Sequence, residues 1–162
     1  MQSRFRLSRY SVLVALFLGL YTTALTRFID LATARAAGPG SFTIRVVGAR
    51  NAKGMIRAAV FHDAKGYPNY ASEAVQTQAA VIDPQTLTAT IVFTNLPEGI
   101  YAISVFHDEN MNQKLDKNFM GIPKEGYGAS NNPKKKMGPP NFEETKFQFN
   151  GTLPVVEIKL MY

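Results

Sequence analysis

The chain has 162 residues, enough for one ordinary domain preceded by a leader, and 46% of them are hydrophobic, which excludes disorder on composition. The formal charge of +6 is uneven: five basic residues and one acid precede residue 37, leaving 13 basic and 11 acidic residues and a charge of +2. A near-neutral domain argues against binding nucleic acid through its overall field. The absence of cysteine excludes a disulfide scaffold, a thiolate metal site and a cysteine nucleophile.

Residues 1–36 predict an export signal or an N-terminal anchor. Three arginines precede an apolar run from Tyr10 to Leu20, which is the order of a charged n-region and a short h-region. Ala34-Arg35-Ala36 fits a small-residue cleavage site, so we expect cleavage near Ala34, Ala36 or Ala37. The mature protein would then be periplasmic or extracellular, with the Gram-negative periplasm favoured. In the alternative, the leader stays uncleaved and is the only membrane attachment, although the run falls short of the ~20 residues of a spanning helix.

From residue 37 to 162 the sequence predicts one all-β domain. Alternating apolar residues bounded by turns predict strands over residues 41–47, 55–61, 79–82, 87–93, 100–106, 142–149 and 155–162. Asn150-Gly151 predicts a hairpin between the last two strands. One short turn of helix is expected between Tyr70 and Gln78. About seven short strands predict a single antiparallel β-sandwich of the prealbumin or immunoglobulin type.

Two of these strands carry a near-repeat, because residues 54–63 and 99–108 both begin with glycine and end in Phe-His-Asp. If the strands share a sheet, His62-Asp63 and His107-Asp108 could meet at one rim, where two imidazoles and a carboxylate would hold a transition metal. In the alternative, each pair makes a local hydrogen bond with no chemistry. The chain shows no hydrolase or metalloprotease motif, which favours a protein that is not an enzyme.

The longest predicted loop covers residues 107–141, and loops of that length are usually functional or stabilised by an ion. Its first part resembles a calcium loop, with side-chain oxygens at positions 1, 3, 5 and 9 and a backbone carbonyl at position 7. These candidate Ca²⁺ ligands are Asp108, Asn110, Asn112, Lys114 and Asp116. A hard cation prefers six to eight oxygen ligands, and this spacing points alternate residues of a curling backbone inward.

The match to a calcium loop is incomplete. Position 6 is Gln113 instead of glycine, and position 12 is Phe119 instead of a bidentate glutamate. A further carboxylate would have to come from Asp63, Glu109 or Glu125. The alternative without an ion is an asparagine-rich turn whose side chains bond the nearby backbone. Spacing alone leaves both alternatives open.

The loop continues with a glycine-rich segment and the basic triplet Lys134-Lys135-Lys136. If the first part is ordered, the loop would present Tyr127, Asn131, Asn132 and the triplet to a partner. An envelope protein, a polysaccharide or a lipid surface would fit. The alternative is a solvated loop tip, because three exposed charges are easily screened.

Several long segments together resemble a bacterial exported family. They are Leu96–Asn110, Lys114–Asp116, Gly121–Gly128, Ser130–Asn132 and Gly138–Phe142. Over roughly residues 42–160 they are similar to the domain-of-unknown-function family 2141, which implies no established activity. Residues 96–101 also resemble the turn into a strand of transthyretin-like and carboxypeptidase-regulatory-like sandwiches, whose modules are structural or adhesive. The resemblance therefore favours a non-catalytic binding or envelope-structural module, and a His/Asp metal-dependent enzyme or a transition-metal-binding protein is the alternative.

Overall fold

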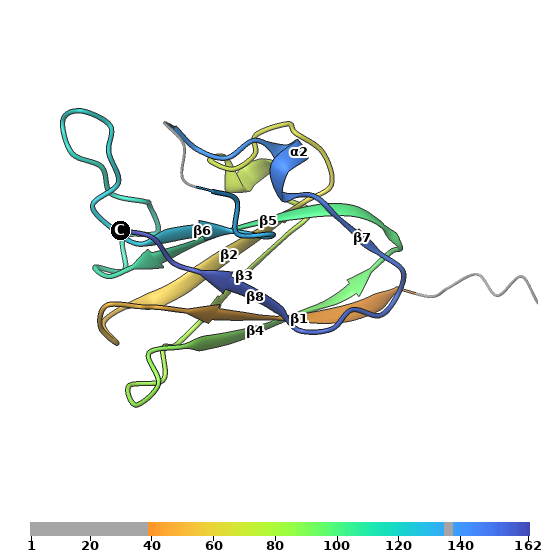
Figure 1. Cartoon of the computed structure of the whole chain (residues 1–162), viewed down its shortest axis with the longest axis horizontal. Coiled ribbons are helices and arrows are strands. Elements are labelled where there is room, and N and C mark those ends of the chain that lie inside the picture. The colour runs from red at the N-terminus through yellow and green to blue at the C-terminus, as the bar shows by residue number, and fades with distance from the viewer. Residues whose placement is uncertain (1–38, 135–137) are drawn as a thin grey trace, which may run out of the picture. The chain divides into compact units, whose positions relative to one another are not determined.

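The computed structural model describes residues 39–134 and 138–162 (Figure 1). The chain divides into the units Met1–Ala36 and Ala37–Tyr162. The predicted leader, and two lysines of the basic triplet, lie outside the described residues. Within the described ranges, no helix is long and apolar enough to cross a membrane.

The described part of the chain is built from strands in two sheets. In the three-stranded sheet, β1 (Gly40–Val47) lies between β4 (Ala89–Leu96) and β8 (Val156–Lys159). In the five-stranded sheet, the order is β3 (Gln76–Ala80), β2 (Met55–Phe61), β5 (Gly99–Asp108) and β6 (Tyr127–Ala129), and β7 (Phe147–Phe149) also pairs with β5. The all-β prediction is confirmed.

The main core lies between the two sheets and is formed by the inward residues of each strand. Alternate side chains of β1, including Phe42, Ile44 and Val46, are buried, as the pleat of a half-buried strand requires. The Phe42 ring lies 5.5 Å from that of Phe93 in β4 and 5.4 Å from that of Phe149 in β7. Residues of both sheets thus share one apolar layer.

A smaller core lies on the other face of the five-stranded sheet, where Phe61 and Ala102 pack with Phe142 and Tyr67. Phe142 belongs to the short helix α2 (Phe142–Thr145), and a 3-10 turn, η1 (Ala71–Glu73), lies in the segment that follows β2. Because β2 and β5 are covered on both faces, their sequences are apolar almost throughout.

The strand prediction is wrong in several places, and the predicted loop 107–141 contains a strand, β6. Residues 142–149 do not form one strand, because Asn141 and Glu144 make a capping box that starts α2. Asn150-Gly151 does not close a hairpin, because β7 pairs with β5 whereas β8 runs parallel to β1. The strand expected at 79–82 is β3, which begins earlier, at Gln76.

The pairing around β5 determines what meets at its C-terminal end. Strand β2 runs antiparallel to β5 and places Met55 opposite Asp108 and Phe61 opposite Ala102. The last residues of the chain join the same end, because Tyr127 and Met161 exchange two backbone hydrogen bonds of 2.9 and 2.8 Å. The turn before β2, the end of β5 and the C-terminus therefore converge.

Candidate functional site

The two Phe-His-Asp sequences lie at opposite ends of paired antiparallel strands. His107 is opposite Ile56 near the start of β2, whereas His62 follows the end of β2. The predicted site that joins His62 to His107 is therefore wrong, because the register separates the two histidines. Asp63 lies beside His62 and accepts a 2.7 Å hydrogen bond from the Lys65 amide, so it is likewise far along the strands from Asp108.

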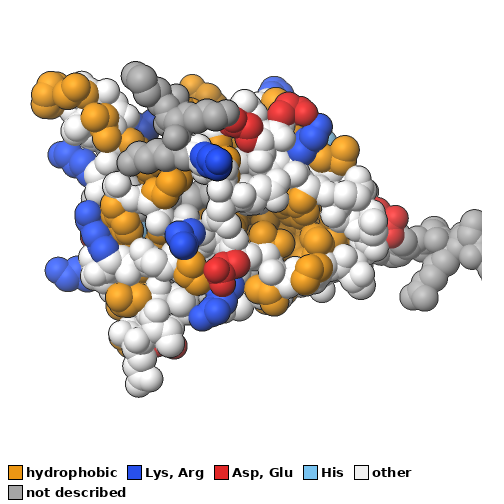
Figure 2. Space-filling model, viewed as in Figure 1, with side chains coloured by type: hydrophobic (Ala, Val, Ile, Leu, Met, Phe, Trp, Pro, Cys, Tyr) orange, Lys and Arg blue, Asp and Glu red, His pale blue; other side chains and the backbone are white. Residues whose placement is uncertain are grey.

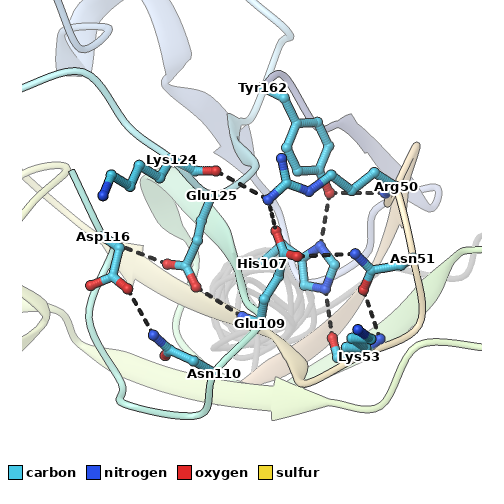
Figure 3. Close-up of polar contacts among 10 residues, drawn as sticks. All are labelled: Arg50, Asn51, Lys53, His107, Glu109, Asn110, Asp116, Lys124, Glu125 and Tyr162. Atoms are coloured by element: carbon cyan, nitrogen blue, oxygen red, sulfur yellow. Dashed lines mark hydrogen bonds and ion pairs between the residues drawn. The ribbon is translucent and has the colours of Figure 1, made fainter. Parts of the chain in front are cut away.

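His107 is completely buried and connects three segments of the chain (Figure 3). Its Nε2 lies 2.7 Å from the carbonyl oxygen of Lys53, and its Nδ1 lies 2.8 Å from the hydroxyl of Tyr162. A carbonyl only accepts, so Nε2 carries the proton and Nδ1 accepts from Tyr162. The Tyr162 oxygen in turn accepts from the Arg50 amide at 3.0 Å. Both ring nitrogens are thus occupied.

Asp108 is also completely buried, and its charge is paired. One carboxylate oxygen, Oδ2, accepts hydrogen bonds from the Arg57 side chain in β2 and from the Gln113 amide at 3.0 Å. The other oxygen, Oδ1, has no hydrogen-bond partner among the described residues. Asp108 therefore anchors the loop to β2 through Arg57.

The backbone of the turn is left-handed at two residues, Met111 and Gln113. Gln113, at position 6, has φ +65°, the left-handed conformation for which such loops use glycine. Its amide bonds the carboxylate at position 1, so the loop closes on its own first residue. Gln113 thus takes a left-handed conformation at position 6 without being glycine.

The asparagines and the last aspartate of the calcium-like pattern do converge. Asp116 Oδ2 accepts a 2.7 Å hydrogen bond from the Asn110 amide group, and Oδ1 accepts one of 3.0 Å from that of Asn112. The Asn110 and Asn112 side-chain oxygens accept from the backbone amides of Asn112 and Lys114 at 3.1 and 2.8 Å. These are the side-chain hydrogen bonds of an asparagine-rich turn.

Glu125 braces the base of the loop. It is 4% exposed, and its Oε1 and Oε2 accept hydrogen bonds of 2.9 and 3.0 Å from the backbone amides of Glu109 and Asp116. The Lys124 amide donates to the Asp116 carbonyl at 2.8 Å. Glu125, one of the carboxylates expected as a further ion ligand, thus holds together the segments of the loop that contain Glu109 and Asp116.

Glu109 faces the turn before β2. Its carboxylate lies 2.6 Å from the Arg50 guanidinium and accepts a 3.0 Å hydrogen bond from the Asn51 side chain. Burial alone would raise the pKa of Glu109, but the hydrogen bonds from Asn51 and Arg50 and the charge of Arg50 outweigh it, and the pKa is lowered. Glu109 therefore forms an ion pair with Arg50 next to the C-terminal end of β5.

Sequence reasoning missed the apolar tip of this loop. The side chains of Phe119, Met120 and Ile122 are 97%, 68% and 54% exposed. Figure 2 shows hydrophobic side chains gathered at the end of the loop that projects from the domain in Figure 1, with basic side chains nearby. The signal in the sequence is an apolar cluster between Lys117 and Lys124 inside a polar loop. We call residues 117–124 the loop tip.

The described residues contain no group of three or more His, Asp or Glu side chains placed to hold a metal ion. A pocket lies at β6 and the segment leading to α2, and it is lined mainly by glycine, alanine and proline. Its charged residues are Lys134 and Glu144, and its lining includes no histidine or serine.

Comparison with known proteins agrees with the resemblance seen in the sequence. The model of a family described as "Uncharacterized protein conserved in bacteria (DUF2141)" matches residues 44–156, which is more than half of the chain. No curated protein and no solved structure matches.

Proposed function

Because the chain belongs to the DUF2141 family, for which no activity is described, we propose a role from its own residues. The protein is an exported, non-catalytic β-sandwich module that binds a partner in the bacterial envelope through the loop of residues 109–125. The observation that carries this proposal is the combination of a braced loop base with an exposed apolar tip. A braced loop loses little conformational entropy on binding, and exposed apolar residues supply contact area.

The state of the titratable groups favours binding over catalysis. A general base needs a lone pair within reach of substrate. Both nitrogens of His107 and both oxygens of Glu125 are engaged by protein groups, and Asp108 is buried against Arg57. These side chains support the loop, and each would have to break its bonds to perform chemistry.

The proposal is tested by photocrosslinking in intact cells. A photoreactive amino acid replaces Phe119 in the full chain, and the matched control replaces Tyr70, which is 68% exposed beyond the opposite end of β2. We expect adducts from position 119 and none from position 70. Absence of any adduct at position 119 would show that the tip contacts nothing and would contradict the proposal.

Calcium is a second element of the proposal, favoured by the backbone of Gln113 and by the buried, unbonded Oδ1 of Asp108. Binding would require the amides of Asn110 and Asn112 to turn their oxygens toward the ion. Extracellular calcium modules bind at roughly 10⁻⁴ to 10⁻³ M. At a hundred times the Kd, a ligand of the native state adds about 2.7 kcal/mol of stability.

The calcium test is thermal unfolding of the metal-stripped protein titrated with CaCl₂ and separately with ZnCl₂. We expect a midpoint rise of several degrees with calcium alone, lost in Asp116→Ala and kept in Asp63→Ala. An unchanged midpoint in the wild-type protein would show that hydrogen bonds alone order the loop.

Export is tested separately, because it rests on residues 1–36. We expect the protein to fractionate with the periplasm and its mature N-terminus to lie near residue 37. An intact N-terminus in the membrane fraction would favour the anchor, and a cytoplasmic protein would contradict export.

A further inference from the structure

The proposed function leaves the partner of the loop tip open. Resting on that function, we infer that the partner is an anionic lipid surface, with the apolar side chains of the tip entering the interfacial layer and the neighbouring lysines lying at the phosphate groups. Four observations carry this inference: exposure, backbone bonding, charge and shape.

The exposed apolar side chains of the tip are concentrated in one turn. Phe119, Met120 and Ile122 lie within four residues, and Phe119 is almost fully exposed. Single exposed apolar residues are common on protein surfaces, but a cluster at one projecting point indicates an interaction site. None of the three side chains belongs to either core, and each is more than half exposed.

Several backbone amides of the tip are paired within the tip itself. The side-chain oxygen of Asn118 accepts from the amides of Met120 and Ile122 at 2.9 and 3.0 Å, and the Asn118 carbonyl accepts from the Gly121 amide at 2.9 Å. The Asn118 amide donates to the Ile122 carbonyl at 2.8 Å. An unsatisfied backbone group is costly in an apolar medium, so this turn can leave water with three consecutive amides already paired.

Basic residues surround the apolar turn. Residues 114–124 contain three lysines and one acid, a net charge of +2. The acid, Asp116, is bonded to two asparagine side chains, and the lysines are exposed and form no ion pair within the described ranges. These lysines are Lys114, Lys117 and Lys124. Exposed ammonium groups next to an apolar tip are complementary to an anionic headgroup layer.

The shape of the tip favours lipid over a protein partner. The loop projects from the domain as a convex point (Figures 1 and 2). A protein partner would need a matching pocket, whereas a bilayer deforms around an inserted turn. Gly121 has φ +79°, and a Cβ at that position would meet no atom, so the turn is open on this side as well.

The test uses the absence of tryptophan from the chain. Phe119→Trp in the full protein places a single indole at the tip, and Tyr70→Trp places one at the opposite end of β2 as the matched control. Each variant is mixed with phosphatidylglycerol or phosphatidylcholine vesicles, with and without brominated acyl chains. Both variants carry the same leader, so attachment of the protein to vesicles through the leader would be the same in both and cannot explain a difference between them.

We expect a blue shift and bromine quenching for the tip indole with phosphatidylglycerol alone, and neither for the control indole. Adding Ile122→Ser should weaken partition about tenfold, and Lys117→Gln about fivefold at low salt. Equal responses at both positions, equal responses to both lipids, or no response would each overturn the inference. If the tip crosslinks to a protein in cells and does not respond to vesicles, the binding role stands and the lipid assignment fails. If the tip forms no adduct at all, both fail.

Discussion

The two Phe-His-Asp sequences of this chain have the same residues and opposite surroundings. The His62 side chain is 59% exposed, and its contact with Asp63 is a 3.2 Å surface pair. His107 and Asp108 are completely buried, and they bond groups from three other segments. The comparison shows that the same strand-end motif is exposed or buried according to which other segments of the chain pack against it.

The glycines that open the two repeats show how the packing differs. A Cβ on Gly54 would lie 1.9 Å from the Asp108 carbonyl oxygen, and Gly54 has φ +68°. A Cβ on Gly99 would lie 3.6 Å from the Tyr101 ring, which is ordinary contact. The turn before β2 therefore rests directly on the end of β5, and only the second His-Asp pair is enclosed.

The largest effect is expected from removing the buried carboxylate. Asp108→Ala leaves Arg57 without its partner and should lower the free energy of unfolding by about 3–5 kcal/mol. Asp63→Ala removes an exposed carboxylate and should change it by less than about 0.5 kcal/mol. Urea unfolding of both variants measures the difference, and similar losses at the two sites would contradict the comparison.

A smaller effect is expected from the histidines. His107→Ala removes the partner of the Lys53 carbonyl and the acceptor of the Tyr162 hydroxyl proton, and it opens a cavity, so we expect a loss of about 2–4 kcal/mol. His62→Ala should again cost less than about 0.5 kcal/mol. The same unfolding experiment checks both values. A stable His107→Ala protein would mean that the C-terminus is held by other contacts.

The smallest expected effect is the pH dependence of the stability that the Glu109–Arg50 ion pair contributes. Since the pKa of Glu109 is lowered by folding, its contribution is present above the unfolded value near 4.5 and is lost as the pH falls through the lower folded pKa. The group is partly exposed, so we expect under about 1 kcal/mol. Glu109→Gln should flatten the acid limb of stability against pH, whereas Asp63→Asn should not. An unchanged acid limb in Glu109→Gln would contradict the ion pair with Arg50.

Local sequence predicted those parts of the fold that depend on local signals. Strand β2 has the predicted bounds because an apolar run is flanked by Gly54 and the polar pair His62-Asp63. The predicted position of β3 was shifted toward the C-terminus, because its first residues, Gln76, Thr77 and Gln78, are polar. They lie in an edge strand with little buried surface. The parallel pairing of β8 with β1 depends on contacts across the whole chain, which no local pattern reveals.

The candidate site likewise has contacts that local sequence predicts and contacts that it does not. The spacing of Asn110, Asn112 and Asp116 predicted their convergence, since a curling backbone directs alternate side chains inward. The partners of His107 and Asp108 were not predictable, because Tyr162 and Arg57 reach them through the sheet register and the C-terminal bridge. The role of Asn118 was not apparent, because the sequence contains many asparagines in turns.

The central claim is that the end of β5 holds the loop in one shape that presents its tip. It is tested most directly by amide hydrogen exchange, resolved by residue, in the wild-type protein and in Glu125→Ala. We expect the amides of Glu109 and Asp116 to be protected in the wild-type protein and to exchange faster in the variant, while β2 stays protected. Rapid exchange at these two amides in the wild-type protein would contradict the claim.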